Sequence, residues 1–334
     1  PLFGYITDKK SLPTMLPFCA AMAGAGFAFV GWVPAYILLM CTVVIIGMAS
    51  ATYHPQASKT VNFLSSDNNK AANMGIFSLG GNAGMAVGSI LMAFLLTLPG
   101  GLHNTMYFVL PGLLVFGLMM KYMPEYKRVN LEHNLKVQAA KKNGSVQKIP
   151  YGGLALVLFF IFMRSTIHTG LSTYLPLFFI NFRNAEPAFA SMLVSCFLLG
   201  GVAGTYVGAV LSDRLGARRI ILGSVLCSIP AIWLIANVTH PAAVLAAVVL
   251  AGFSIIGSFA TTTILAQTML PNNVGMAAGL TIGFSVGMGG FGVTILGFLA
   301  DNYGLPFVMN LMTVLPVIAT LTAFKIPVPP QMQK

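Results

Sequence analysis

Ten long apolar stretches follow one another along this chain, with short polar links between them. They cover residues 13–31, 34–53, 71–98, 104–123, 151–182, 188–211, 219–238, 241–264, 275–299 and 305–326. Each has the roughly 20 residues that a helix needs to cross the hydrocarbon core of a bilayer. Because lipid offers no hydrogen-bond partners, a spanning segment must satisfy its own backbone groups, as an α-helix does. The pattern therefore predicts an all-α, polytopic membrane protein of about ten helices.

The composition agrees with lipid as the solvent of this chain. Charged residues make up 7% of the sequence and hydrophobic residues 57%, with a mean hydropathy of +0.84. Soluble domains carry about 25% charged residues. So few charges could not cover a soluble protein of 334 residues.

The cations predict the orientation of the spans. When the links are assigned alternately to the two sides, every Lys and Arg except Arg164 and Arg183 falls on one side. The positive-inside rule places that side in the cytoplasm, together with the polar segment 123–150. The net charge of +11 is then a topogenic signal that also attracts anionic membrane lipid, and no nucleic acid is needed to explain it.

The chain also repeats itself at a spacing of about 205 residues. Two links each carry a hydroxyl, an Asp and a cation, and their acids, Asp8 and Asp213, lie 205 positions apart. Internal repeats of this kind are typical of secondary transporters. We expect an N-terminal bundle at 1–122, a cytoplasmic linker at 123–150 and a C-terminal bundle at 151–334. Equal halves would need two more spans before Pro1, so we expect a fragment without its first two helices.

The two links resemble the loop signature Gly-x-x-x-Asp-Arg/Lys-x-Gly-Arg-Arg/Lys of the major facilitator superfamily. The matching residues are Asp213, Arg214, Gly216 and Arg218 in the second link, and Gly4, Asp8 and Lys9 in the first. The resemblance implies two pseudo-symmetric six-helix bundles. From it we expect Asp8, Lys9, Asp213, Arg214 and Arg218 to act in gating. We further expect Asp213 to accept hydrogen bonds from Arg214, Arg218 or a helix N-terminus near residues 275–278.

Three further stretches resemble one branch of that superfamily, the fosmidomycin resistance proteins. They are residues 47–58 with their His-Pro-x-x-Ser pattern, residues 80–84, and residues 267–290 with their Leu-Pro-x-x-x-Gly-Met run. This resemblance implies a twelve-helix, proton-driven exporter of the bacterial inner membrane, with a small-molecule substrate such as fosmidomycin.

Three predicted spans carry glycines at every fourth position. They are Gly80, Gly84 and Gly88; Gly200, Gly204 and Gly208; and Gly279, Gly283 and Gly287. This spacing puts the glycines of one span on one helix face, where they allow helices to approach closely. We expect these faces to form the interface at which the two halves rock, as the resemblance implies. The alternative is ordinary helix packing within a bundle.

Arg164 is the one charge predicted well inside a span. It lies about 20 Å along a helix that begins at Tyr151, where an Arg costs at least roughly 2.5–3.5 kcal/mol. His168 and Ser172 follow at one-turn intervals and share its helix face. An Arg offers a planar, bidentate fork to an anion. We therefore expect Arg164, His168 and Ser172 to bind an anionic substrate, with a structural Arg as the alternative.

His54 and Gln267 lie at corresponding span ends of the two halves. We expect them to converge with Arg164 on one solvent-accessible cavity, open to a single side of the membrane. His54 also has the chemistry to carry a proton. A local structural role at the helix ends is the alternative for both residues.

The sequence leaves the energy source and the direction of transport open. None of the spans carries a central Asp or Glu, so we expect a coupling carboxylate before Pro1, with His54 or His168 as the proton carrier otherwise. A phosphate-binding Gly-x-x-x-x-Gly-Lys loop is absent, which excludes ATP as the fuel. The sequence predicts no metal site and no cofactor, and we expect a monomer.

We expect proton-coupled export of a small organic compound or drug. One form of this hypothesis has an anionic compound as the substrate. Uptake of an organic anion or metabolite by symport in the same fold is the alternative. An intramembrane enzyme that uses His54 or His168 is a remote third hypothesis. The spans lack the His and Glu spacings that such chemistry needs.

Overall fold

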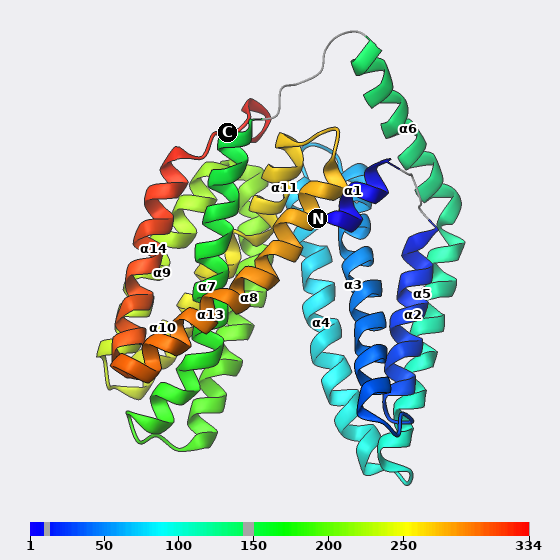
Figure 1. Ribbon diagram of the computed structural model, residues 1–334. Coiled ribbons are helices and arrows are strands. Elements are labelled where there is room, and N and C mark those ends of the chain that lie inside the picture. Colours follow the sequence, from blue (N-terminus) through cyan, green and yellow to red (C-terminus); the bar gives the residue numbers. More distant parts are fainter. Residues whose placement is uncertain (10–13, 143–149, 334) are drawn as a thin grey trace. The chain divides into compact units, whose positions relative to one another are not determined.

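The computed structural model describes residues 1–9, 14–142 and 150–333, and helices account for nearly all of them (Figure 1). No strand occurs in these ranges, which confirms the all-α prediction. The helices are α1 (Leu2–Lys9), α2 (Met15–Val30), α3 (Tyr36–Leu64), α4 (Lys70–Thr97), η1 (Gly101–Phe108), α5 (Val109–Lys121), α6 (Met123–Lys142), α7 (Tyr151–Asn181), α8 (Pro187–Leu215), α9 (Ala217–Asn237), α10 (Pro241–Gly257), α11 (Phe259–Met269), α12 (Val274–Ala278), η2 (Gly279–Gly283), α13 (Phe284–Tyr303), α14 (Leu305–Lys325) and η3 (Pro330–Met332).

Within the described ranges, nine helical segments are long and apolar enough to cross a membrane, and Met15–Val30 is a shorter apolar helix of 16 residues. These ten segments correspond to the ten predicted stretches. The nine are Tyr36–Leu64, Lys70–Thr97, Gly101–Lys121, Tyr151–Asn181, Pro187–Leu215, Ala217–Asn237, Pro241–Met269, Val274–Tyr303 and Leu305–Lys325. Large apolar side chains remain on their outer faces, such as Tyr36 and Ile37, as expected for surfaces covered by lipid.

Some helices run further than their apolar stretches suggested. The prediction ended the second span near His54, but α3 continues through Pro55 to Leu64. A proline removes only one backbone donor, and helices in membranes tolerate that loss. The extra turns carry polar residues that are buried by protein rather than by lipid, including Gln56, Ser58 and Lys59.

The chain divides into two compact units. Unit 1 consists of Pro1–Ser65, Gly80–Lys148 and Pro271–Gly279, and unit 2 of Ser66–Leu79, Ile149–Leu270 and Leu280–Lys334. Each unit therefore includes a short segment from the other half of the sequence. The predicted boundaries at 122 and 151 do not provide for these exchanged segments, and the division into two transport bundles stays a prediction.

Unit 1 is built around α2, which packs along α3 and α5. Its small residues allow this close approach: a Cβ on Gly24 would lie 2.7 Å from the Cα of Gly112 in α5. Thr105 of η1 fixes the end of α2, because its hydroxyl accepts from the N–H of Gly31 at 3.1 Å and donates to the carbonyl of Ala28 at 2.9 Å.

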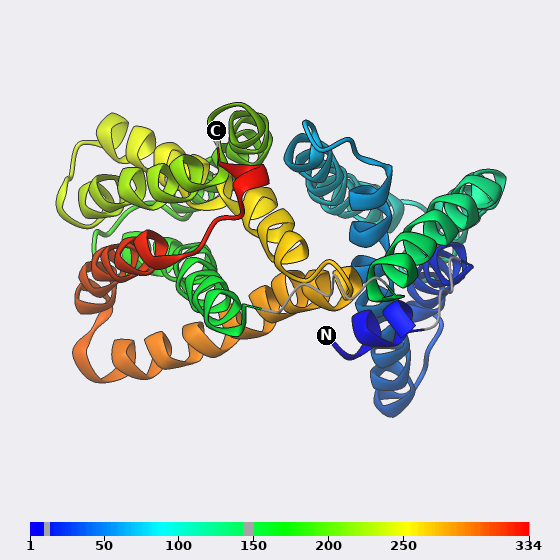
Figure 2. The ribbon, with the colours of Figure 1, turned by 90° about the horizontal axis from the view of Figure 1, so that it is seen from above.

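Unit 2 has an apolar core shared by six helices, of which α13 contributes Leu296. Fully buried side chains meet there from α7, α8, α9, α10 and α14, among them Leu171, Phe197, Ile232, Val248 and Met312. Helix α14 lies beside α7 and α9, and α10 lies beside α8 and α9 (Figure 2). This core holds α7, the helix of Arg164, in place.

Three of the spanning segments are not regular α-helices throughout, and the first of them, Gly101–Lys121, begins with the 3-10 helix η1. The segment Pro241–Met269 is interrupted at Ser258, between α10 and α11. The segment Val274–Tyr303 contains a π-helical turn at Gly279–Gly283. Such turns are rare and often lie at functional sites.

Helix α6 covers most of the segment expected to link the two halves. It carries exposed ion pairs between Arg128 and the flanking acids Glu125 and Glu132. The predicted end of the linker, residues 143–149, lies outside the described residues.

Candidate functional site

The first repeat of the link motif forms a buried ionic cluster in unit 1. Asp8, at the end of α1, accepts hydrogen bonds from the backbone N–H groups of Gly275 at 3.0 Å and Met276 at 2.8 Å. These groups lie in the first turn of the Val274–Tyr303 segment, where N–H donors lack intrahelical partners and the helix dipole favours an anion. Asp8 thus ties α1 to a segment 267 residues away in the chain.

Lys59 of α3 completes this cluster. Its ammonium lies 2.9 Å from Asp8 and donates to the carbonyl of Thr7 at 3.1 Å. The side chains of Lys59 and Asp8 are each 4% exposed. The sequence did not single out Lys59, although a Lys six residues beyond the predicted end of the span at residue 53 was the available signal.

The second repeat forms the corresponding contact in unit 2. Asp213, near the end of α8, accepts from the N–H groups of Ala71 at 3.2 Å and Ala72 at 2.7 Å, in the first turn of α4. The prediction that Asp213 binds a helix N-terminus is confirmed, but the predicted helix was wrong. Asp8, and not Asp213, binds the residues near Gly275, because each acid contacts the exchanged segment of its own unit.

The three predicted gating cations lie outside these buried contacts. Lys9 is exposed and packs over the ring of Tyr5, with the ammonium 4.6 Å from its centroid. Arg214 is exposed, and Arg218 donates to the carbonyl of Phe324 in α14. Of the alternatives expected for Asp213, a helix N-terminus is the one that these contacts show, through two backbone donors of α4.

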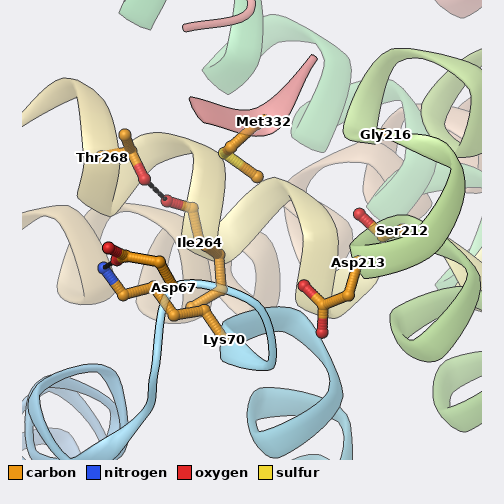
Figure 3. Close-up of a pocket in the computed structure, with 8 residues that line it drawn as sticks. All are labelled: Asp67, Lys70, Ser212, Asp213, Gly216, Ile264, Thr268 and Met332. Carbon is orange, nitrogen blue, oxygen red and sulfur yellow. Dashed lines mark hydrogen bonds and ion pairs between the residues drawn. The ribbon is translucent and has the colours of Figure 1, made fainter. Parts of the chain in front are cut away.

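A small pocket with a mixed polar and apolar lining opens beside Asp213 (Figure 3). Its volume is about 40 Å³, room for a few waters or one small ion. It is lined by Asp67, Lys70, Ser212, Asp213, Gly216, Ile264, Thr268 and Met332. All of these residues belong to unit 2.

Arg164 is enclosed between α7 and α11. Its side chain donates to the Thr262 hydroxyl at 3.2 Å, and its guanidinium lies 5.0 Å from the centre of the Phe259 ring. Arg164 is only 4% exposed, so its side chain is enclosed by protein in this structure, and the solvent-accessible cavity expected around it stays a prediction. Across the described ranges, no carboxylate lies within ion-pair distance of this guanidinium.

His168 and Ser172 follow Arg164 on α7 but have other neighbours. The ring of His168 lies 5.6 Å from that of Phe197 in α8. The Ser172 hydroxyl donates to the carbonyl of His168 at 2.9 Å, within its own helix. The shared face is therefore divided, with Arg164 directed to α11 and His168 to α8.

The other two predicted binding residues differ in their exposure. His54 is exposed on α3 beside the ring of Tyr53, in unit 1. Gln267 is 1% exposed on α11, in unit 2. Their convergence with Arg164 stays a prediction, and so does the role of all five residues in substrate binding.

The glycine ladder of α8 is a packing interface within unit 2. Cβ atoms added at Gly200, Gly204 and Gly208 would lie 2.4, 2.0 and 2.0 Å from three carbonyl oxygens of α10. A side chain at any of these positions would push the two helices apart. For this ladder the contacts support helix packing within a bundle, and not the expected rocking interface.

The other two ladders are different. Around Gly80, Gly84 and Gly88 of α4, an added Cβ would meet no described atom within 4 Å, so their predicted role at the moving interface stays a prediction. The π-helical turn shifts the helical register between Gly279 and Gly283. Gly279 lies against Pro1 whereas Gly287 faces open space, so this ladder does not form the single face that was predicted.

The comparisons with known proteins agree with this architecture. The major facilitator superfamily profile matches residues 1–185 and again residues 154–334. The chain is 29% identical over 331 residues to the uncharacterized MFS-type transporter YfnC of Bacillus subtilis (strain 168), covering 98% of this chain and 80% of that protein. It is 27% identical over 325 residues to the fosmidomycin resistance protein of Escherichia coli (strain K12), covering 97% and 79%.

Solved structures show the same fold at low sequence identity. The E. coli fucose:proton symporter FucP matches with a TM-score of 0.75 at 13% identity, over 98% of this chain and 87% of that one. The human organic anion transporter MFSD10 matches with a TM-score of 0.73 at 13% identity, over 97% and 79%. The proton:xylose symporter XylE matches with a TM-score of 0.75 at 12% identity, over 99% and 84%.

The repeated profile match, the related transporters and the membrane-spanning helices all point to one family, whose members move small molecules and are not enzymes. This chain therefore belongs to the major facilitator superfamily and is a multi-pass membrane transporter.

Proposed function

We propose that this transporter exports a small organic compound from a bacterial cell across the inner membrane, driven by protons. The similarity to the fosmidomycin resistance protein over 97% of the chain supports export of such a drug. Fosmidomycin or a chemically similar anion is the first candidate substrate. The symport activities in the titles of FucP and XylE belong to far more distant proteins, and likeness at 12–13% identity carries the fold alone.

Arg164 is the observation that carries the anionic part of this proposal. A guanidinium has five N–H donors, and a buried one needs a compensating anion or hydrogen bonds. Arg164 has the Thr262 hydroxyl and the face of Phe259 as neighbours, with no carboxylate in reach in the described part of the chain. The anionic group of a substrate would supply that counter-charge once α7 and α11 move apart.

His168 is the proposed proton carrier of this site. It lies one turn after Arg164 on α7, and its ring is half-buried against Phe197. A proton on His168 would add a second positive charge next to Arg164 and favour an anion there. Because that proton and the anion would strengthen each other's binding, they would move together, so exchange of protons for substrate also needs a step in which proton binding displaces the anion.

The two Asp contacts are proposed as latches on the cytoplasmic side, as the cation distribution orients the chain. Each ties the motif helix of one half of the sequence to the exchanged segment of the other half. A change of state that moves either segment would have to break a charged hydrogen-bond pair. Both latches would then set how readily the transporter opens on that side.

The test uses inside-out membrane vesicles from a host that lacks its own exporter. Export predicts that labelled fosmidomycin enters these vesicles when a proton gradient is formed and leaks out when an uncoupler is added. Arg164→Lys keeps the charge but loses the planar fork, so we expect weaker uptake; Arg164→Ala should abolish it. Thr268→Ser serves as a matched control for α11, because it keeps a hydroxyl near the cytoplasmic end.

Two results would overturn parts of this proposal. Accumulation in right-side-out vesicles would assign uptake by symport instead of export. Full drug resistance from cells that express Arg164→Ala would remove Arg164 from the binding site and leave it a structural role.

A further inference from the structure

A short segment that follows the last spanning helix packs back on unit 2. Helix α14 ends at Lys325, and residues 326–333, here called the C-terminal strap, continue without helical structure until the short helix η3 (Figure 2). The strap contains Pro327, Pro329 and Pro330, and each proline fixes one backbone dihedral angle. Its end is tied into a turn, because the Gln333 side chain donates a hydrogen bond to the carbonyl of Val328. The strap is therefore a stiff segment with a defined path.

The strap is packed against the cytoplasmic ends of the spanning helices, as the cation distribution orients the chain. Ile326 and Val328 are both buried, although they lie beyond the last span. Pro327 crosses the first turn of α7, where a Cβ on Gly153 would lie 2.5 Å from its Cγ. The same Cβ would lie 3.7 Å from Cε of Met269, the last residue of α11. Gly153 thus allows the strap to pass close to α7 and α11.

The strap ends at the contact between Asp213 and the first turn of α4. Met332 is half-buried and lines the pocket beside this contact. The pocket lining comes from three helices, with Lys70 of α4, Asp213 of α8 and Ile264 of α11 among its residues. In Figure 3 the Met332 side chain points from η3 toward Ile264. An apolar side chain therefore lies where three helices of unit 2 meet.

The repeat shows what takes this place in unit 1. Segments Tyr36–Leu64 and Pro241–Met269 begin and end 205 positions apart, as do the two acids of the link motif. This register pairs Lys59 with Ile264, toward which Met332 points. In unit 1 the ammonium of Lys59 lies beside the acid, whereas in unit 2 the strap reaches the corresponding position from another part of the chain.

The strap itself has a different structure in the first repeat. In the same register its residues correspond to 121–128, which form the end of α5 and the beginning of α6. A helix thus stands in the first repeat where the second has an extended, proline-rich segment. The strap is a feature of the second half alone, and the overall packing of a repeat does not require it.

We propose that the C-terminal strap is an autoinhibitory contact that holds the Asp213 latch closed. This inference rests on the latch role proposed for Asp213. Met332 keeps water away from the charged hydrogen bonds between Asp213 and α4, and such bonds are stronger in a low dielectric. Because Met332 touches a pocket built by α4, α8 and α11 together, separation of these helices costs its contacts. The strap therefore lowers the fraction of molecules that open on this side.

Hydrogen exchange at two backbone amides measures the latch directly. The N–H groups of Ala71 and Ala72 are bonded to Asp213, so they exchange with solvent deuterium only when the latch opens. The experiment uses the purified full chain in detergent and mass spectrometry with fragmentation that resolves single amides. We expect Met332→Ala to raise the exchange rate of these two amides about tenfold, because part of the free energy of burying the Met side chain is lost.

The first latch is the internal reference for this measurement. The N–H groups of Gly275 and Met276 are bonded to Asp8 in unit 1, and the strap belongs to unit 2. We expect their exchange rates to stay unchanged in Met332→Ala. A rise of equal size at both latches would show a general loosening of the protein and would overturn the inference.

Two neighbouring glycines of α7 provide a matched pair of variants. The methyl group of Gly153→Ala would meet the ring of Pro327 and lift the strap, so exchange at the Asp213 latch should rise as it does in Met332→Ala. Gly152→Ala places the same methyl group in open space one residue earlier and should leave the rates unchanged. Combining Gly153→Ala with Met332→Ala should add little, because both act through one strap.

Unchanged exchange at Ala71 and Ala72 in both Met332→Ala and Gly153→Ala would overturn the inference. Asp213→Asn separates this failure from failure of the latch. If Asp213→Asn raises the exchange of these amides and the strap variants do not, the latch stands and the strap has no part in it. If Asp213→Asn leaves the rates unchanged, the latch fails, and the proposed action of the strap fails with it. Export and the role of Arg164 are tested separately, because no transport is measured.

Discussion

Asp8 and Asp213 make the same kind of contact with a helix N-terminus, but the residues beside the two acids differ. In both, an acid at the end of one helix accepts hydrogen bonds from two successive N–H groups in the first turn of another. In unit 1 a buried lysine neutralises the acid at 2.9 Å. In unit 2 the corresponding position is Ile264, and a pocket takes the space.

This difference teaches that the geometry of the helix contact and the balance of its charge are separate properties. The contact needs only an acid and the free N–H groups of a helix N-terminus, which any sequence provides. The counter-charge comes from a third helix, so it can be lost from one repeat without loss of the contact. The stability of the Asp8 contact in unit 1 should therefore depend on the ion pair with Lys59. The stability of the Asp213 contact in unit 2 should depend on the groups that surround Asp213.

The largest expected effect is that of Lys59→Ala. Removing one partner of a buried ion pair leaves an uncompensated charge and typically costs about 3–5 kcal/mol. Asp8 keeps two backbone donors, so we expect the lower end, about 3 kcal/mol, measured as a loss of Tm and of urea resistance in detergent. The neighbouring variant Lys9→Ala is the control, since Lys9 is exposed and its ammonium lies over the ring of Tyr5.

The double variant Asp8→Asn with Lys59→Met separates charge from packing. It removes both charges together, and a neutral buried pair is often close to the parent protein in stability. We expect it to recover most of the stability that Lys59→Ala loses. Equal losses in the single and the double variant would show that the lysine stem, and not the ion pair, holds the cluster together.

The next effect in size is that of Asp213→Asn. An amide keeps one acceptor oxygen, so the change loses a charge-assisted hydrogen bond, worth about 1.5–3 kcal/mol. Because no buried lysine stands at the corresponding position, we expect a smaller loss of Tm than for Lys59→Ala. Transport should fall while membrane insertion is unchanged; vesicles with the kinetics of the parent protein would argue against a latch.

The residues that sequence reasoning identified correctly are those whose role follows from local chemistry. A contact with a helix N-terminus was one of the alternatives predicted for Asp213, and Asp213 makes such a contact; Asp8 makes one too, although none was predicted for it. The partner was wrong for Asp213, because the choice between α4 and α12 depends on which segments the two units exchange. Nothing in the spacing of the motifs carries that information.

The predictions for the glycine ladders and for Arg164 considered each helix without its neighbours. Glycines four residues apart lie on one face, but the sequence does not say what that face contacts; those of α8 contact α10 of the same unit. The spacing rule also assumes a regular helix, and the π turn at Gly279–Gly283 breaks it. Burial of Arg164 depends on how α11 follows the interruption at Ser258, which no local pattern predicted.

Another prediction concerns the small residues at which the two helices of each latch meet. A Cβ on Gly4 would lie 2.2 Å from the carbonyl oxygen of Gly275, so Gly4→Ala forces α1 away from its partner. The repeat places Ala209 at this position in unit 2, and there the glycine is on the other helix, Gly75. We expect Gly4→Ala to cost about 1–3 kcal/mol through overpacking.

The reciprocal variants test that exchange of small residues. Gly75→Ala should destabilise unit 2 in the same way, because its Cβ would lie 2.6 Å from that of Ala209. Combining it with Ala209→Gly moves the methyl group from one helix to the other and should restore most of the Tm. A double variant no better than Gly75→Ala would mean that the two positions do not pack as a pair.

The smallest effect is expected for Asp67→Asn, which removes the one acid that is bonded to Lys70 at the start of α4. The pair is 2.7 Å long, but the Asp67 side chain is 91% exposed. Exposed pairs are screened by water and salt and are worth under about 1 kcal/mol. In the 205-residue register the corresponding position of the first latch is Asn272, so this pair is an addition that unit 1 does without. We expect a change in Tm close to the error of the measurement, and one that vanishes at high salt. A loss as large as that of Asp213→Asn would instead place Asp67 inside the latch, as a second acid that holds the N-terminus of α4 in unit 2.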